Sequence, residues 1–136
     1  MIKAVIDTNV MVSALLAAKD SNSNPLAIME AIRDGKVIPL YSEDILAEYE
    51  EVLLRPKFNL NEDTVYALLR SIQDVGIYSC GQSEYRAAHE DDHFFLDALQ
   101  PHLPEAFLIT GNLKHYPQAS FIISPKQAVE MLIDMT

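Results

Sequence analysis

The stretch MIKAVIDTNVMVSALL, residues 1–16, decides the fold class. Its first part, Ile2–Ile6, is short, apolar and β-branched, which is typical of a buried strand. Asp7, Thr8 and Asn9 follow, and the next apolar segment, residues 10–18, predicts a helix. Because ligands of open parallel sheets bind beyond the carboxyl ends of the strands, a carboxylate at this position is expected to face a crevice.

Strands and helices alternate along the rest of the chain. Short apolar runs predict strands over residues 37–41, 77–80, 106–110 and 120–123. Capping residues and helical periodicity predict helices over residues 24–36, 42–56, 61–76, 91–100 and 124–135. This alternation predicts an α/β fold, a central parallel sheet with helices on both faces, in a single domain over residues 1–136.

The composition narrows the class of protein. Hydrophobic residues make up 49% of the 136 residues and charged residues 22%, as in ordinary globular domains. We expect no signal peptide and no membrane span, and the single cysteine, Cys80, fits a reducing cytoplasm. A net charge of −10 argues against binding of nucleic acid by the whole surface. It leaves open a local basic rim, or carboxylates that a metal neutralises.

Polar residues directly follow two of the predicted strands. Asp7 ends the first strand, and Thr110, Gly111 and Asn112 follow the apolar run 106–109. If these strands are neighbours where the strand order reverses, both turns open into the same crevice. A hard divalent cation is the natural partner of a carboxylate there.

Helical geometry selects two further acids, at about 100° per residue. Glu48 lies at the edge of the apolar stripe of its helix, where a side chain can reach the rim of a cleft. Asp92 falls inside the apolar arc of its helix although it is charged. Asp97 points away from that arc and is expected to be solvated, whereas Asp91 is expected to be the N-cap.

Five segments together resemble a PIN domain. They are VIDTNVMVSALL, SEDILAEYEEVLLRPKF, DDHFFLDALQ, LITGNLKHYP and IISPKQAVEML, in family order from Met1 to about Leu132. The similarity is greatest to PIN-family proteins described as toxins of toxin–antitoxin pairs, the VapC-like ribonucleases. The resemblance implies a Rossmann-like PIN fold and a divalent-metal-dependent endoribonuclease that hydrolyses RNA phosphodiester bonds.

The resemblance also implies roles for individual residues. Asp7, Glu48 and Asp92 match the catalytic acids, which bind Mg²⁺ or Mn²⁺, and Asn9 and Thr110 match polar residues that brace them. Three converging carboxylates repel one another strongly without a cation. A cation held by them can lower the pKa of a bound water and neutralise charge on a phosphate.

Asn112 falls where many PIN domains have a fourth acid. It is therefore expected to contribute to metal binding, but as an amide it departs from the fullest acidic set. The number of metal ions, one or two, stays open.

The resemblance implies three kinds of partner. They are an RNA substrate, a cognate antitoxin protein whose Arg or Lys would reach the carboxylates, and a second copy of the chain in a homodimer or higher homo-oligomer. The leucine-rich segment 60–72 is a candidate for the face between copies. Arg55, Lys57 and the run 114–116 could contact RNA, or could be ordinary solvated or helix-end residues.

Other functions are weighed against this one. His89 and His93 stand four residues apart, but no zinc motif surrounds them. A haloacid-dehalogenase-like phosphatase needs an acid two residues after Asp7, where this chain has Asn9. The main alternative is a catalytically weak or inactive PIN-like module that binds RNA or a protein partner, which Asn112 and the net acidity favour.

Overall fold

The computed structural model describes residues 1–17 and 21–135, so residue 18, the expected end of the first helix, lies outside the described residues. The strands are β1 (Ile2–Ile6), β2 (Val37–Tyr41), β3 (Ile77–Tyr78), β4 (Ala106–Ile109) and β5 (Ile122–Ile123). The helices are α1 (Thr8–Leu16), α2 (Asn24–Arg33), α3 (Glu43–Leu53), α4 (Glu62–Val75), α5 (His93–Leu99) and α6 (Pro125–Asp134). Short 3-10 turns are η1 (Pro56–Phe58), η2 (Glu90–Asp92), η3 (Gln100–His102) and η4 (Leu113–His115).

The described strands form one parallel sheet in the order β3-β2-β1-β4-β5. The chain builds outward from β1 to β3 and then crosses to β4 on the other side of β1, so the strand order reverses between β1 and β4. Ile6 of β1 is paired with Ile109 of β4, which brings Asp7 and Thr110 side by side. The predicted parallel α/β sheet is confirmed, and the condition set for a shared crevice, that these two strands are neighbours, is met.

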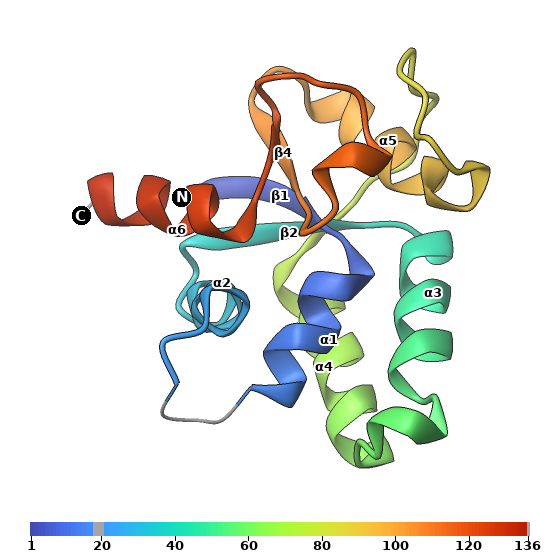
Figure 1. The fold of residues 1–136 in the computed structure, drawn as a ribbon, viewed down its shortest axis with the longest axis vertical. Helices are drawn as coiled ribbons and strands as arrows, with labels where there is room; N and C mark the ends of the chain where they lie inside the picture. The colour runs from blue at the N-terminus through green and yellow to red at the C-terminus, as the bar shows by residue number, and fades with distance from the viewer. Residues whose placement is uncertain (18–20, 136) are drawn as a thin grey trace.

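Helices cover both sides of the sheet, and Figure 1 draws α5 above the ribbons of β1 and β2, with α1, α2 and α4 below them. α5 packs against β1 and β4 through the fully buried side chains of Phe95, Leu96 and Leu99. Val5 and Ile6 of β1 are buried as well, as their continuous apolar run predicts. Within the described residues, no helix has the length and apolar character needed to cross a membrane.

The helix ends follow the local sequence signals. Ser42 caps α3 through the backbone N–H of Ile45, and Asn61 caps α4. Ser124 and Gln127 form a reciprocal capping box at α6, with Pro125 in the first turn. These caps fix where each helix begins, and therefore which of its side chains reach the sheet edge.

Two predictions around α5 are wrong. Asp91 is exposed within η2 and does not cap the helix, which begins at His93 because the N–H of Asp92 bonds to the carbonyl of His89 and tightens this turn. Asp97 is half-buried rather than solvated. Its carboxylate accepts from the backbone N–H of Ser83 at 2.8 Å and lies 3.4 Å from His93 Nε2, because a loop from β3 returns over this face.

Candidate metal centre

Asp7 stands at the centre of the site because of its place between β1 and α1. Its backbone N–H bonds to the carbonyl of Ile109 at 2.9 Å, so the sheet ladder fixes its position. Its carboxylate caps α1 through the N–H of Asn9 at 3.3 Å, and it also accepts from Thr110 Oγ1 at 2.7 Å and from the Tyr116 hydroxyl at 3.3 Å. The side chain is only 5% exposed, so these donors replace most of its contact with water.

Glu48 reaches the site from α3. The hydroxyl of Thr8, the first residue of α1, donates to Glu48 Oε2 at 3.3 Å. The next residue, Tyr49, is buried and its hydroxyl donates to the carbonyl of Ile6, which ties α3 to the end of β1. The expected edge position of Glu48 is thus explained: Tyr49 is anchored under the sheet edge and Glu48 faces the opening above it.

Asp92 reaches the site from η2, beside two imidazoles. His115 Nδ1 lies 3.8 Å from Asp92 Oδ2, and the rings of His115 and His89 meet edge to face at 4.9 Å between centroids. The backbone N–H of Ala88 bonds to the carbonyl of His115 at 2.7 Å, which holds the two loops together. This pairing sets Asp92 on the side of the opening that faces η4.

The three acids line one cavity of about 210 Å³ at the carboxyl end of β1, called the acidic cavity below. Its other lining residues are Thr8, Asn9, Val52, Arg55 and His115. The acids come from positions 7, 48 and 92, and from three different elements. The tertiary structure therefore brings together the three residues that the sequence selected separately.

Two of the three acids in the acidic cavity, Glu48 and Asp92, have raised pKa values. Burial raises the pKa of Glu48, the hydrogen bond from Thr8 opposes that rise, and the negative charge of Asp92 adds to it. Burial also raises the pKa of Asp92, as does the nearby carboxylate of Asp7, whereas His115 lowers it. Burial and Asp7 together raise the pKa of Tyr116.

Of the polar residues expected to support the acids, Thr110 lies closest to them. Thr110 is fully buried and donates to Asp7, and its hydroxyl accepts from the backbone N–H of Asn112 at 3.0 Å. Asn9 is exposed and lines the acidic cavity. Asn112 does not line it; instead it faces a neighbouring cavity that shares Asn9.

The donor set suits a hard divalent cation, since the lining of the acidic cavity presents three carboxylates, the Thr8 hydroxyl and the Asn9 amide. Within the described residues, no group of three or more His, Cys, Asp or Glu side chains could hold a metal ion as it stands. Mg²⁺ keeps several of its waters in proteins and is bound directly by one or two carboxylates. The lining therefore fits a cation held partly through water.

Two contributors were missed in the sequence. Thr8 follows Asp7 directly, but nothing in its local pattern indicates a bond to a residue 40 positions away. Tyr116 was considered only for RNA contact, and its bond to Asp7 spans 109 positions.

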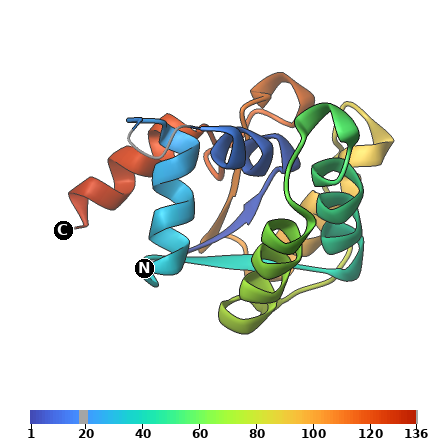
Figure 2. The same ribbon diagram turned by 90° about the horizontal axis from the view of Figure 1, so that it is seen from below.

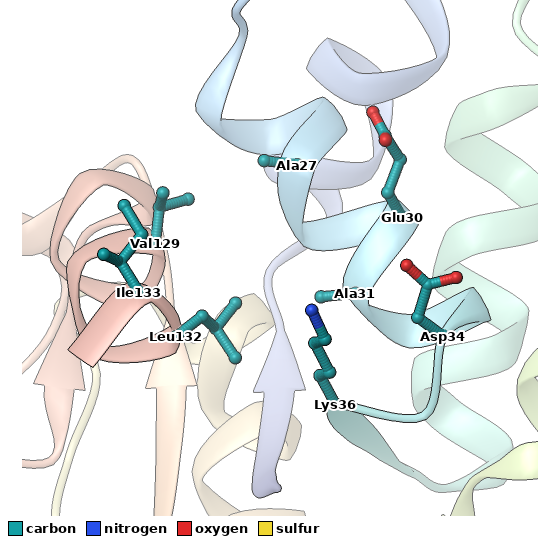
Figure 3. A pocket seen from close by; sticks show the side chains of 8 residues that line it. All are labelled: Ala27, Glu30, Ala31, Asp34, Lys36, Val129, Leu132 and Ile133. Carbon is teal, nitrogen blue, oxygen red and sulfur yellow. The ribbon is translucent and has the colours of Figure 1, made fainter. Parts of the chain in front are cut away.

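A second hollow lies between α2 and α6, away from the acidic cavity. This groove, of about 310 Å³, has Val129, Leu132 and Ile133 of α6 facing Ala27 and Ala31 of α2 (Figure 3). Its charged lining residues are Glu30, Asp34 and Lys36. Its floor is made of short apolar side chains rather than of converging acids.

The chain is similar in sequence to known proteins. A family model described as "PIN domain" matches residues 3–114. An uncharacterized protein of Methanocaldococcus jannaschii, MJ1680, is 30% identical over 115 residues, which cover 82% of this chain and 71% of the relative. No solved structure matches the chain significantly.

Proposed function

Because this chain belongs to the PIN domain family, whose members are in general nucleases, we propose that it is a divalent-metal-dependent endoribonuclease that hydrolyses RNA phosphodiester bonds. The observation that carries the proposal is the acidic cavity, where carboxylates from three distant segments converge at the reversal of strand order. A purely structural cluster would not need Glu48 and Asp92 to stand beside Asp7, since burial and neighbouring carboxylates raise the pKa of both Glu48 and Asp92.

Asp7, Glu48 and Asp92 would hold Mg²⁺ or Mn²⁺, directly or through water. When bound, the ion supplies an acidified water and neutralises charge on the phosphate. Asn112, which lines the adjoining cavity, is proposed to take part through a bound water, because its side chain does not enter the acidic cavity.

The remaining polar side chains have defined tasks in this proposal. Thr110 and Tyr116 donate to one carboxylate oxygen of Asp7, Oδ2, and so hold the carboxylate in a fixed orientation. Thr8 does the same for Glu48. Arg55 and His115 line the cavity as donors that can face the phosphate of the bound RNA.

The test is cleavage of a labelled RNA oligonucleotide with Mn²⁺ present and with EDTA. We expect cleavage only with the metal, and its loss in Asp7→Asn and Asp92→Asn proteins that keep the wild-type circular dichroism spectrum. Asp34→Asn, an acid-to-amide change in the α2–α6 groove, is the matched control and should cleave normally. Metal-dependent cleavage that survives in Asp7→Asn would refute the assignment.

We extend the proposal to a cellular role as the toxin of a toxin–antitoxin pair in the cytoplasm, acting as a single domain over residues 1–136. An Arg or Lys of the cognate antitoxin would reach the carboxylates of the acidic cavity. A homodimer or higher homo-oligomer is part of the same proposal. Co-expression with the neighbouring open reading frame tests the role, since growth arrest by this chain should be relieved by the antitoxin.

A non-cutting PIN-like module that binds RNA or protein is the competing function. Two observations favour it: the acids do not form a ready three-ligand group, and the fourth acidic position is Asn112. Metal-dependent stabilisation separates the two functions, because a competent site gains stability when the ion binds the folded state.

A further inference from the structure

We propose that the cavity beside the acidic cavity binds a nucleobase of the RNA strand whose phosphate lies over the carboxylates. This inference rests on the function proposed above and adds a subsite to it. The cavity, called the base cavity, has a volume of about 440 Å³. Four features carry the inference: its connection to the acidic cavity, its free amide groups, its aromatic ring and its lack of charge.

The two cavities adjoin at one residue. Asn9 lines both of them. The segment around the turn η1 also touches both, because Arg55 just before the turn lines the acidic cavity and Phe58 at its end lines the base cavity. Figure 2 shows the chain segment between α3 and α4, which contains η1, beside the N-terminal helix α1. A strand with one phosphate over the acids can therefore place an adjacent base in the second cavity.

Asn9 and Asn112 offer amide groups to that base. Within the described residues, both asparagines form hydrogen bonds only through main-chain atoms. The N–H of Asn9 donates to the Asp7 carboxylate, and the N–H of Asn112 donates to the Thr110 hydroxyl. The carbonyl of Asn112 accepts from the N–H of His115. Each side-chain amide keeps two N–H donors and one acceptor oxygen. Paired donors and acceptors of this kind match the edge of a base, as Asn does in reading adenine.

Phe58 supplies a ring for stacking. Its side chain is half-buried, and Lys57 Nζ lies 5.1 Å from the ring centroid. Val10, Val12, Pro25 and Pro125 complete an apolar wall around it. Unpaired RNA bases are recognised by stacking on aromatic side chains together with hydrogen bonds to their edges.

The residues that line the base cavity also favour a base over a phosphate as the ligand. No Lys, Arg, Asp, Glu or His is among the described residues that line the base cavity, whereas the acidic cavity contains five such residues, three acids with Arg55 and His115. An uncharged cavity with apolar walls and amide edges suits a flat, neutral ligand with polar edges. None of the described side chains that line it compensates the charge of a phosphate, and Lys57 Nζ lies over the Phe58 ring outside this lining.

The test uses the full chain in EDTA, so that it does not depend on cleavage. NMR signals of the side-chain amides of Asn9 and Asn112 are followed while each of four ribonucleosides, or ribose, is added. These ligands carry no phosphate, so carboxylates without a metal do not repel them. We expect at least one nucleoside to shift both amide signals and ribose to leave them in place. Phe58→Leu should weaken nucleoside binding by roughly tenfold because stacking is lost. Asn112→Ala should weaken it by roughly the same factor because hydrogen bonds to the base edge are lost.

Tyr66→Leu and Gln73→Ala, an aromatic and an amide on α4 outside both cavities, are the matched controls and should bind like the wild type. Equal shifts from ribose, or unchanged affinity in both Phe58→Leu and Asn112→Ala, would overturn the base-cavity proposal. If the protein binds nucleosides here but does not cut RNA, only the nuclease proposal is refuted. If the protein cuts RNA but these shifts do not occur, only the base-cavity proposal is refuted.

Discussion

The acidic cavity and the α2–α6 groove are hollows of comparable size, about 210 and 310 Å³, with opposite linings. The groove is floored by alanines and by branched side chains of α6, which the hydrophobic effect can bring together without any ligand (Figure 3). The acidic cavity gathers carboxylates against their mutual repulsion. The presence of a hollow is therefore weak evidence of function. The electrostatic cost of bringing its lining residues together is stronger evidence.

The contrast between the acidic cavity and the groove would fail most clearly if one of the three acids proved dispensable for RNA cleavage. Asp7→Asn is expected to lower RNA cleavage by at least about a hundredfold, since losing even an outer support of a metal ligand costs about 10- to 100-fold. The amide keeps the shape of the side chain but not its charge. Single-turnover cleavage in Mn²⁺ measures the loss. Asp34→Asn in the groove should leave the rate unchanged.

Metal binding should distinguish the two hollows next. Mn²⁺ at about 100 times its dissociation constant should stabilise the fold by about 2.7 kcal/mol, a rise of several degrees in Tm. Thermal unfolding with increasing Mn²⁺ measures this gain. Asp92→Asn should remove most of it, and Asp34→Asn should not. An unchanged Tm at millimolar Mn²⁺ would favour the non-cutting module.

A change in the groove should affect stability and leave the chemistry intact. Leu132→Ala removes an apolar side chain that is only partly buried, so we expect a loss of about 1–2 kcal/mol, below the 2–5 kcal/mol typical of a fully buried leucine. Urea unfolding measures the loss. The Leu132→Ala protein should cleave RNA at 20 °C at the same rate as the wild type, in contrast to the Asp7→Asn protein.

Thr8 should act on Glu48 alone. Thr8→Val keeps the buried shape but removes the donor to Glu48 Oε2, so we expect roughly a tenfold weaker response to Mn²⁺. Thr8→Ser should restore it. The Mn²⁺ concentration at half-maximal cleavage separates this positioning role from a general loss of stability, which would lower the rate at every metal concentration.

The smallest expected effect is on pH dependence in EDTA. The pKa values of Glu48 and Asp92 are raised above their ordinary values of 4.5 and 3.8, so the folded state binds these protons more tightly than the unfolded state. Their contribution to the free energy of unfolding is therefore most favourable below the ordinary values and declines as pH rises through the raised ones. Because both side chains are part-exposed, we expect less than about 1 kcal/mol.

The matching measurement is urea unfolding of wild type, Glu48→Gln and Asp34→Asn between pH 4 and 7. Stability of the wild type relative to Glu48→Gln should fall as pH rises through this range. A Glu48→Gln curve parallel to the wild type would remove the electrostatic argument, whereas Asp34→Asn serves only to show the effect of an acid-to-amide change outside the acidic cavity.

Sequence by itself determined the elements and the positions of Asp7, Glu48 and Asp92 along them. The end of β1 at Asp7, the caps at Ser42 and Asn61, and the capping box at Ser124 follow from neighbours within about four residues, where periodicity and capping act. The same local reasoning failed at Asp97, whose solvation is removed by the loop that donates from Ser83. That partner lies 14 positions away and leaves no trace in helical periodicity.

Only the tertiary structure decided what surrounds the acids. Thr110 and Tyr116 reach Asp7 across 103 and 109 positions because β4 lies next to β1, and Thr8 reaches Glu48 because α3 is anchored under the sheet edge. Strand order also put Asn112 beside the acidic cavity rather than in it. Contacts of this range depend on how elements pack, and local preference along the chain cannot encode which distant donor meets a given carboxylate.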